Sequence, residues 1–192
     1  MTQKAYFIQY KFILPAEIKH SSYTYQKLFR ALYGYTQNVT KSNGKRYKYF
    51  RNGVLSKVPY VRTGKNCVTI PPGELTKLTD FFKTGKNPTH YWHVKGDWKA
   101  VYYMDGKGIT DEDACNACEA LLRRAQIALP QSEPDSISNQ LEHAINNKNT
   151  NSEYLKLLKT EAEGIINQVW FKETYKLSDK LNNFFNLYKS LP

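Results

Sequence analysis

The chain has 192 residues, of which 41% are hydrophobic and 14% aromatic, and its formal net charge is +11. This length and composition predict a folded protein with one core and a helical extension, and they exclude an intrinsically disordered chain. The apolar runs are far shorter than the roughly 20 residues of a membrane span, the N-terminus lacks a secretory signal, and three cysteines are too few for a disulfide framework, so we expect a cytoplasmic protein without membrane contacts.

The positive charge is concentrated in the first part of the chain. Residues 1–110 contain 19 lysines and arginines and 5 acidic residues, whereas residues 111–192 contain 9 and 12. Between Glu17 and Glu74 there is no acidic side chain, but there are eleven basic ones. Because this segment lacks internal counter-charges, it repels itself unless a polyanion binds to it.

The first predicted elements are a strand and a helix. Residues 4–14 are rich in aromatic and β-branched residues and end at Pro15, which predicts a strand inside the sheet. A helix of about four turns follows over residues 22–37, with Ser21 or Ser22 as its N-cap and Gly34 near its end.

The basic segment SNGKRYKYFRNGVLSKVPYVRTGKN follows at residues 42–66, with seven basic residues, four aromatic ones and no acidic one. Its Asn52-Gly53 pair is the signal of a two-residue hairpin turn, and RTGKN marks a second turn. We therefore predict strands near residues 46–51, 54–62 and 66–70.

The predicted hairpin has two unequal faces. One face, which we expect to be core, carries Tyr47, Tyr49, Val54, Val58 and Tyr60. The other face carries Arg46, Lys48 and Lys57 around Phe50 and Leu55. Lys48 would directly oppose Lys57, an unfavourable pair that a phosphate between the two ammonium groups would stabilise. Two alternatives stay open: base stacking by the tyrosines, and lysines that merely protect a solvated edge from aggregation.

This pattern predicts that the chain binds DNA or RNA. Lysines and arginines would contact the phosphate backbone, and Phe50 or a tyrosine would stack on a base. The preceding helix and loop would extend the same surface. The predicted binding residues are Lys27, Arg30, Lys41, Lys45, Arg46, Lys48, Phe50, Arg51, Lys57, Arg62 and Lys65. No cofactor is expected.

The rest of the chain completes an α+β prediction: a basic antiparallel sheet of hairpins with packed helices, followed by an all-helical C-terminal region. A short helix with Gly85 past its end precedes a second hairpin that turns at residues 95–97. From Thr110 an N-capped helix runs to Pro130. We predict a domain over residues 1–128, a linker with a weak helix over 129–151, and a long kinked helix or helical pair over 152–192.

A metal site is a weaker prediction. His90, His93, Cys115 and Cys118 are zinc-compatible ligands in two pairs spaced three apart. A strand through 90–94 would send the two histidines to opposite faces, and the cysteines lie in a predicted helix among alanines. We therefore expect no metal, and small-residue helix packing for the cysteines.

Two other functions stay open beside non-enzymatic binding. The enzymatic alternative is a nuclease or nickase that uses the basic surface, with His90, His93 and Asp97 as its candidate catalytic residues. HYWH has two residues between its histidines where a His-hydrophobic-His nickase motif has one, and an acid in a turn is typical of a turn former. The other alternative is an adaptor subunit of a nucleoprotein assembly, whose C-terminal helices pair with a second copy or a protein partner.

Overall fold

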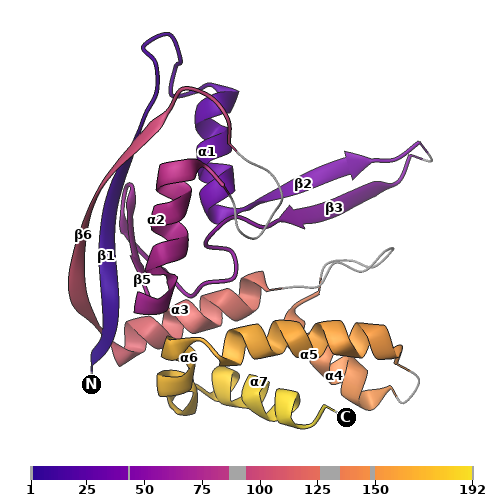
Figure 1. Ribbon diagram of the computed structural model, residues 1–192. Helices are drawn as coiled ribbons and strands as arrows, with labels where there is room; N and C mark the ends of the chain where they lie inside the picture. The colour runs from indigo at the N-terminus through magenta and orange to yellow at the C-terminus, as the bar shows by residue number, and fades with distance from the viewer. Residues whose placement is uncertain (1, 43, 87–93, 126–134, 148–149, 192) are drawn as a thin grey trace. The chain divides into compact units, whose positions relative to one another are not determined.

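The computed structural model describes residues 2–42, 44–86, 94–125, 135–147 and 150–191 (Figure 1). The chain divides into two compact units. The sheet unit comprises Lys4–Gly108, and the helical unit comprises Ile109–Pro192 together with Met1–Gln3. The sequence predicts the first domain boundary at residue 128, whereas the structure places it near residue 109. The helix that begins after Thr110 therefore belongs to the helical unit and not to the sheet unit.

The sheet unit has the order β1 (Thr2–Ile13), α1 (Tyr23–Tyr33), β2 (Tyr35–Thr40), β3 (Arg46–Arg51), β4 (Val61–Gly64), β5 (Cys67–Ile70), a 3₁₀ turn (Pro72–Glu74), α2 (Leu75–Thr84) and β6 (Lys99–Thr110). The main antiparallel sheet has the strand order β4-β5-β1-β6, and β2 and β3 form a separate two-stranded sheet. Without β2 and β3 the order is β-α-β-β-α-β, the split β-α-β arrangement. The predicted α+β class is confirmed.

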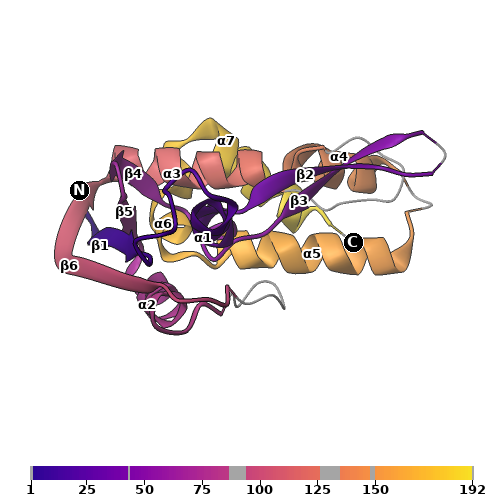
Figure 2. The ribbon, with the colours of Figure 1, turned by 90° about the horizontal axis from the view of Figure 1, so that it is seen from above.

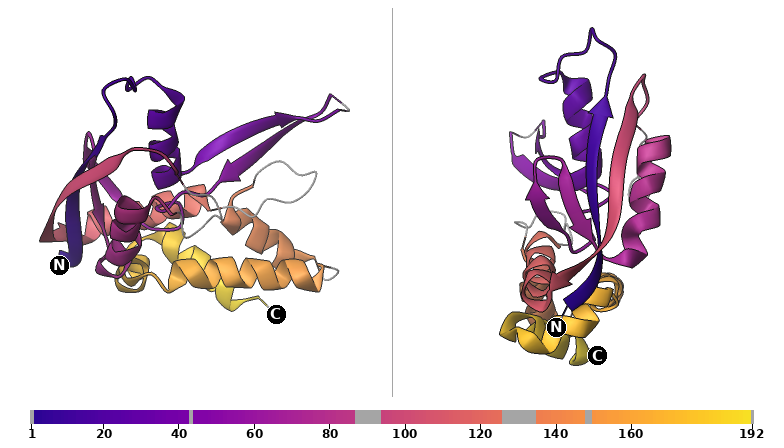
Figure 3. Two further views of the ribbon diagram at one scale, coloured as in Figure 1. Left: turned by 45° about the horizontal axis from the view of Figure 1, so that its top comes forward. Right: turned by 90° about the vertical axis from the view of Figure 1, so that its left-hand side faces the viewer.

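One face of the main sheet carries the core of this unit. The alternation along β1 buries Ile8, Tyr10 and Phe12, and these pack with Leu28 of α1 and Phe81 of α2. Both helices therefore lie on the same side of the sheet (Figure 1). The right-hand view of Figure 3 shows β1 running inside the sheet, as predicted from its aromatic and β-branched residues.

The predicted turn at Asn52-Gly53 is wrong. β3 pairs with β2 instead of with residues 54–62. Of that predicted strand only residues 61 and 62 are in a strand, the start of β4 (Val61–Gly64). The predicted pairing of Lys48 with Lys57 is therefore also wrong, because Lys48 lies opposite Asn38. Tertiary packing explains the difference: Val54, Leu55 and Val58 are buried in the core of the sheet unit.

The first predicted helix is correct at its start and too long at its end. The Ser22 hydroxyl caps α1 by accepting a hydrogen bond from the Tyr25 N–H at 3.2 Å. The helix ends at Tyr33 because Gly34 takes φ 79°, a conformation that favours glycine. The residues beyond Gly34 start β2 and do not form a fourth helical turn.

The helical unit consists of α3 (Asp111–Arg124), α4 (Ile137–Asn146), α5 (Ser152–Ile166), α6 (Val169–Thr174), a 3₁₀ turn (Tyr175–Leu177) and α7 (Asp179–Lys189). The last 40 residues therefore form more helices than the predicted kinked helix or pair. Thr110 caps α3 and Ser178 caps α7, each by accepting a backbone hydrogen bond. None of the helices in the described ranges is both long and apolar enough to cross a bilayer.

The apolar stripe of the C-terminal helices lies mostly inside this unit. Leu158, Trp170, Leu181 and Phe184 are at most 1% exposed. Leu177, by contrast, is 63% exposed. The stripe thus serves the unit's own core, and self-association through these helices stays a prediction.

Candidate nucleic-acid interface

The basic ribbon consists of β2, β3 and the connection Lys41–Lys45 between them. Its strands pair antiparallel in a continuous register from Tyr35 opposite Arg51 to Thr40 opposite Arg46. Figures 1 and 2 show the ribbon extending away from the end of α1 and from the main sheet. It carries five basic residues and no acidic one: Lys41, Lys45, Arg46, Lys48 and Arg51. It therefore presents unopposed positive charge on a narrow, elongated element.

One side of the ribbon, which we name the Asn38 face, carries small polar and basic side chains. The register places Thr36, Asn38, Thr40, Arg46, Lys48 and Phe50 there. Asn38, Arg46 and Lys48 are exposed, and within the described residues their side chains make no hydrogen bond or ion pair. The prediction that Arg46, Lys48 and Phe50 share a face is confirmed, although Lys57 and Leu55 are not on it.

On the opposite side, the Tyr49 face, several side chains contact one another or Arg30 of α1. Arg51 donates through Nε to Oε1 of Gln37 at 2.9 Å, and its guanidinium lies 5.7 Å from the centre of the Tyr49 ring. Arg30 of α1 lies 5.0 Å from the centre of the Tyr35 ring. The predicted burial of Tyr49 in the core is wrong, because this residue is only half-buried and lies on the ribbon, outside the core of the sheet unit.

The base of the ribbon is fixed to the end of α1. Consecutive carbonyl oxygens of the last helical turn accept hydrogen bonds from the chain that leaves β3: Ala31 from the Val54 N–H and Leu32 from the Leu55 N–H, both at 2.8 Å. These bonds satisfy carbonyls that the helix itself leaves unpaired. The ribbon is thereby stiffened, since an isolated two-stranded hairpin is only marginally stable.

Two glycines and a serine allow the close approach at this base. A Cβ on Gly53 would lie 2.7 Å from the Ala31 carbonyl oxygen, so only glycine fits there. The Ser56 hydroxyl accepts from the Gly53 N–H at 2.7 Å and donates to the Tyr33 carbonyl at 3.2 Å. The ring of Phe50 lies against Gly34, which places this predicted stacking residue at the base of the ribbon.

The remaining predicted binding residues lie outside the ribbon. Lys27 is half-buried on α1, and Lys57 is exposed on the turn that anchors β3. Arg62 on β4 lies 4.7 Å from the centre of the Tyr33 ring, and Lys65 lies in the turn from β4 to β5. Arg30 on α1 reaches a ribbon side chain, the ring of Tyr35.

Residues of β2 were missed from the sequence, although a signal for them exists. Thr36, Asn38 and Thr40 alternate with Tyr35, Gln37 and Val39 directly after the glycine that ends α1, a period-two pattern typical of a strand. A second Asn-Gly pair, Asn43-Gly44, lies between the two strands.

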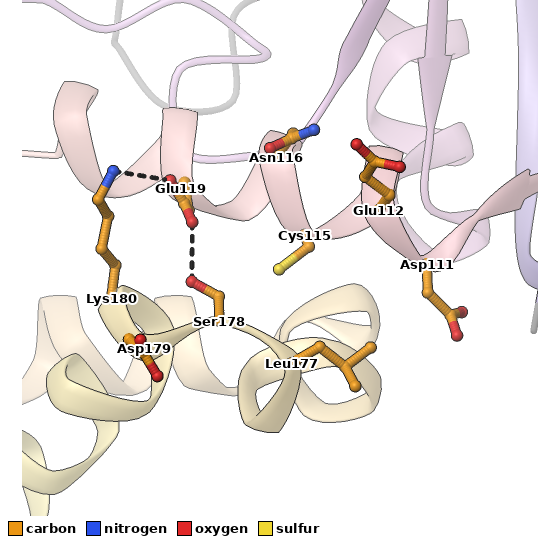
Figure 4. Close-up of a pocket in the computed structure, with 9 residues that line it drawn as sticks. All are labelled: Asp111, Glu112, Cys115, Asn116, Glu119, Leu177, Ser178, Asp179 and Lys180. Carbon is orange, nitrogen blue, oxygen red and sulfur yellow. Dashed lines mark hydrogen bonds and ion pairs between the residues drawn. The ribbon is translucent and has the colours of Figure 1, made fainter.

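The helical unit contains a polar pocket of about 460 Å³ between α3 and the start of α7 (Figure 4). Its lining residues are Asp111, Glu112, Cys115, Asn116, Glu119, Leu177, Ser178, Asp179 and Lys180. Ser178 donates to Glu119 at 2.7 Å, and Lys180 lies 3.3 Å from the same carboxylate. These contacts, the serine bond first, hold the pKa of Glu119 below its ordinary value.

The cysteines in this unit are poor nucleophiles. Burial raises the pKa of Cys115, and it raises the pKa of Cys118 to about 12. No cluster of three or more potential metal ligands occurs among the described residues. His90 and His93 lie outside the described residues, and Asp97 is exposed in the turn before β6.

Comparison with known proteins adds no functional information. No family model matches the chain, and no curated protein and no solved structure shows significant similarity to it.

Proposed function

We propose that this protein binds nucleic acid and that the basic ribbon is its principal contact surface. The observation that carries the proposal is the projection of a two-stranded ribbon with five basic residues from a segment that has no acidic side chain between Glu17 and Glu74. Lysine and arginine side chains on such an element gain favourable interactions from a phosphate backbone and relieve their mutual repulsion.

The hydrogen bonds between the base of the ribbon and α1 support a binding role, because they hold the ribbon in place before a ligand binds. The strand that leaves the ribbon continues into Val54 and Leu55, which are 1% exposed in the core of the sheet unit. A ribbon held at its base loses less conformational entropy on binding than a free loop of the same charge.

The proposal predicts strongly salt-dependent binding. If about five basic side chains neutralise phosphates, the logarithm of affinity falls against the logarithm of salt concentration with a slope of roughly −4 to −5. Fluorescence anisotropy of labelled random-sequence DNA and RNA, in about 50 mM and about 200 mM salt, measures this slope.

A charge-matched pair of variants locates the surface. The triple variant Lys45→Gln, Arg46→Gln, Lys48→Gln removes three positive charges from the ribbon. The control Lys156→Gln, Lys159→Gln, Lys172→Gln removes three exposed charges from the helical unit. We expect the ribbon variant to lose most of its affinity and the control to bind as the wild type does. Absence of binding at the lower salt, or equal losses in both variants, contradicts the proposal.

A further inference from the structure

The two faces of the basic ribbon differ in the nucleic acid that each could contact. The Asn38 face offers hydrogen-bonding groups on short side chains, whereas the Tyr49 face offers aromatic rings. Edges of paired bases are recognised by hydrogen bonds, while unpaired bases are recognised largely by stacking. The face that is free to bind therefore determines the class of ligand.

The rings of Tyr49 and Tyr35 on the Tyr49 face are already engaged. The guanidinium groups of Arg51 and Arg30 lie at 5.7 Å from the centre of Tyr49 and at 5.0 Å from the centre of Tyr35. Arg51 is further held by its 2.9 Å hydrogen bond to Gln37. A base that stacks on Tyr49 or Tyr35 would have to share or displace these cations, so these two rings are poorly prepared for a single strand.

The Asn38 face has the opposite character. Asn38 and Lys48 lie directly opposite each other, with Thr40 and Arg46 as the next pair toward the tip on the same face. Asparagine pairs with adenine through two hydrogen bonds, and arginine or lysine pairs with guanine. The only ring on this face belongs to Phe50, which lies at the base against Gly34.

From these observations we propose that the basic ribbon enters the major groove of duplex DNA, with the Asn38 face toward the base edges. The inference rests on the proposed nucleic-acid binding and adds the ligand class and the contact face. The major groove of B-form DNA is about 12 Å wide and admits a two-stranded ribbon. A six-residue strand is about 20 Å long, which lets both pairs on the face reach bases.

Duplex RNA fits this geometry badly. Its major groove is deep and too narrow for side chains to read, and its wide minor groove presents few distinguishing groups. The ribbon should therefore prefer duplex DNA over duplex RNA of the same sequence, although both carry the same backbone charge.

The test compares four labelled probes with the full-length protein: a random-sequence DNA duplex of about 21 base pairs, its single strands, and RNA in both forms. Methyl green, which occupies the major groove, and distamycin, which occupies the minor groove, serve as competitors for the DNA duplex. We expect DNA duplex to bind about tenfold or more tightly than the other probes, and methyl green alone to displace the protein.

Two uncharged changes then assign the face. DNA duplexes selected from the random pool for tight binding to the wild type should bind it more tightly than unselected duplex does. The variant Asn38→Ala, Thr40→Ala should lose this difference in affinity but keep the salt slope of the wild type. The variant Tyr49→Ser should keep the difference in affinity. Tighter binding to single strands that is lost in Tyr49→Ser, equal binding of duplex RNA, or displacement by distamycin overturns this inference and leaves the proposed function standing. Absence of binding to all four probes overturns both.

Discussion

The backbone N–H of Val54 donates to the carbonyl oxygen of Ala31 at 2.8 Å, although the two residues are separated by the entire basic ribbon. The neighbouring bond from Leu55 to Leu32 repeats the contact one residue further along. β2 therefore starts, and β3 ends, close to the C-terminal turn of α1. The direction of the ribbon is consequently set by a helix whose buried face packs in the core of the sheet unit.

Gly53→Ala should destabilise the sheet unit. The added Cβ would lie 2.7 Å from the Ala31 oxygen and would force apart the backbone at the base of the ribbon. We expect a loss of about 1–3 kcal/mol, measured as a lower melting temperature by circular dichroism. Gly73→Ala is the matched control, because nothing lies within 4 Å of a Cβ there. An equal loss in both variants would show that the close approach does not exist.

The same contact explains which parts of the fold could be predicted. The helix starts at Ser22 and Thr110 follow from capping residues and local spacing, and both were predicted correctly. The strand that pairs with β3 could not be predicted from local spacing, because Asn52-Gly53 carries the local signal of a hairpin turn and so indicates the wrong partner. Only the tertiary position of Gly53 against α1 shows that its glycine serves close backbone contact.

The sequence predicted which basic residues form the candidate site, but it did not predict which residues lie beside them. The positive charge and the absence of acidic residues can be read from the sequence alone, and they identified the basic residues of β3 as candidates for binding. The face that accompanies them depends on β2, whose residues Asn38 and Thr40 carry no charge and were assigned to no element. Their role follows only from the register that places Asn38 opposite Lys48.

Native-state thiol labelling should distinguish the cysteines. Burial raises the pKa of Cys118 to about 12, so at pH 8 only about one molecule in 10⁴ carries the reactive thiolate. The half-buried Cys67 should react first with a thiol reagent, and Cys118 only after unfolding in guanidinium. Mass spectrometry of the peptides identifies the labelled residue, and Cys67→Ser should abolish the fast phase. Rapid labelling of Cys118 in the folded protein would contradict its burial.

Glu119 should make the helical unit sensitive to acid. Its folded-state pKa lies below the ordinary value of about 4.5, chiefly because Ser178 donates to the carboxylate. The stabilising contribution is therefore present above pH 4.5 and is lost as the pH falls through the folded value. Glu119→Gln should lower stability by about 1 kcal/mol at neutral pH and by less in acid. Glu173→Gln, at an exposed position, is the control, and the prediction fails if both variants show the same pH dependence.

The salt dependence of single-charge variants should separate the ribbon from the rest of the basic segment. Lys48 lies on β3, whereas Lys65 lies in the turn between β4 and β5. If the ribbon alone contacts phosphates, Lys48→Gln should reduce the magnitude of the salt slope by up to about 0.9, and Lys65→Gln should leave it unchanged. Anisotropy titrations on one DNA duplex at several salt concentrations measure both slopes, with Lys83→Gln on α2 as the control. Equal reductions for Lys48→Gln and Lys65→Gln would instead extend the binding surface to the main sheet, as the acid-free segment between Glu17 and Glu74 predicts.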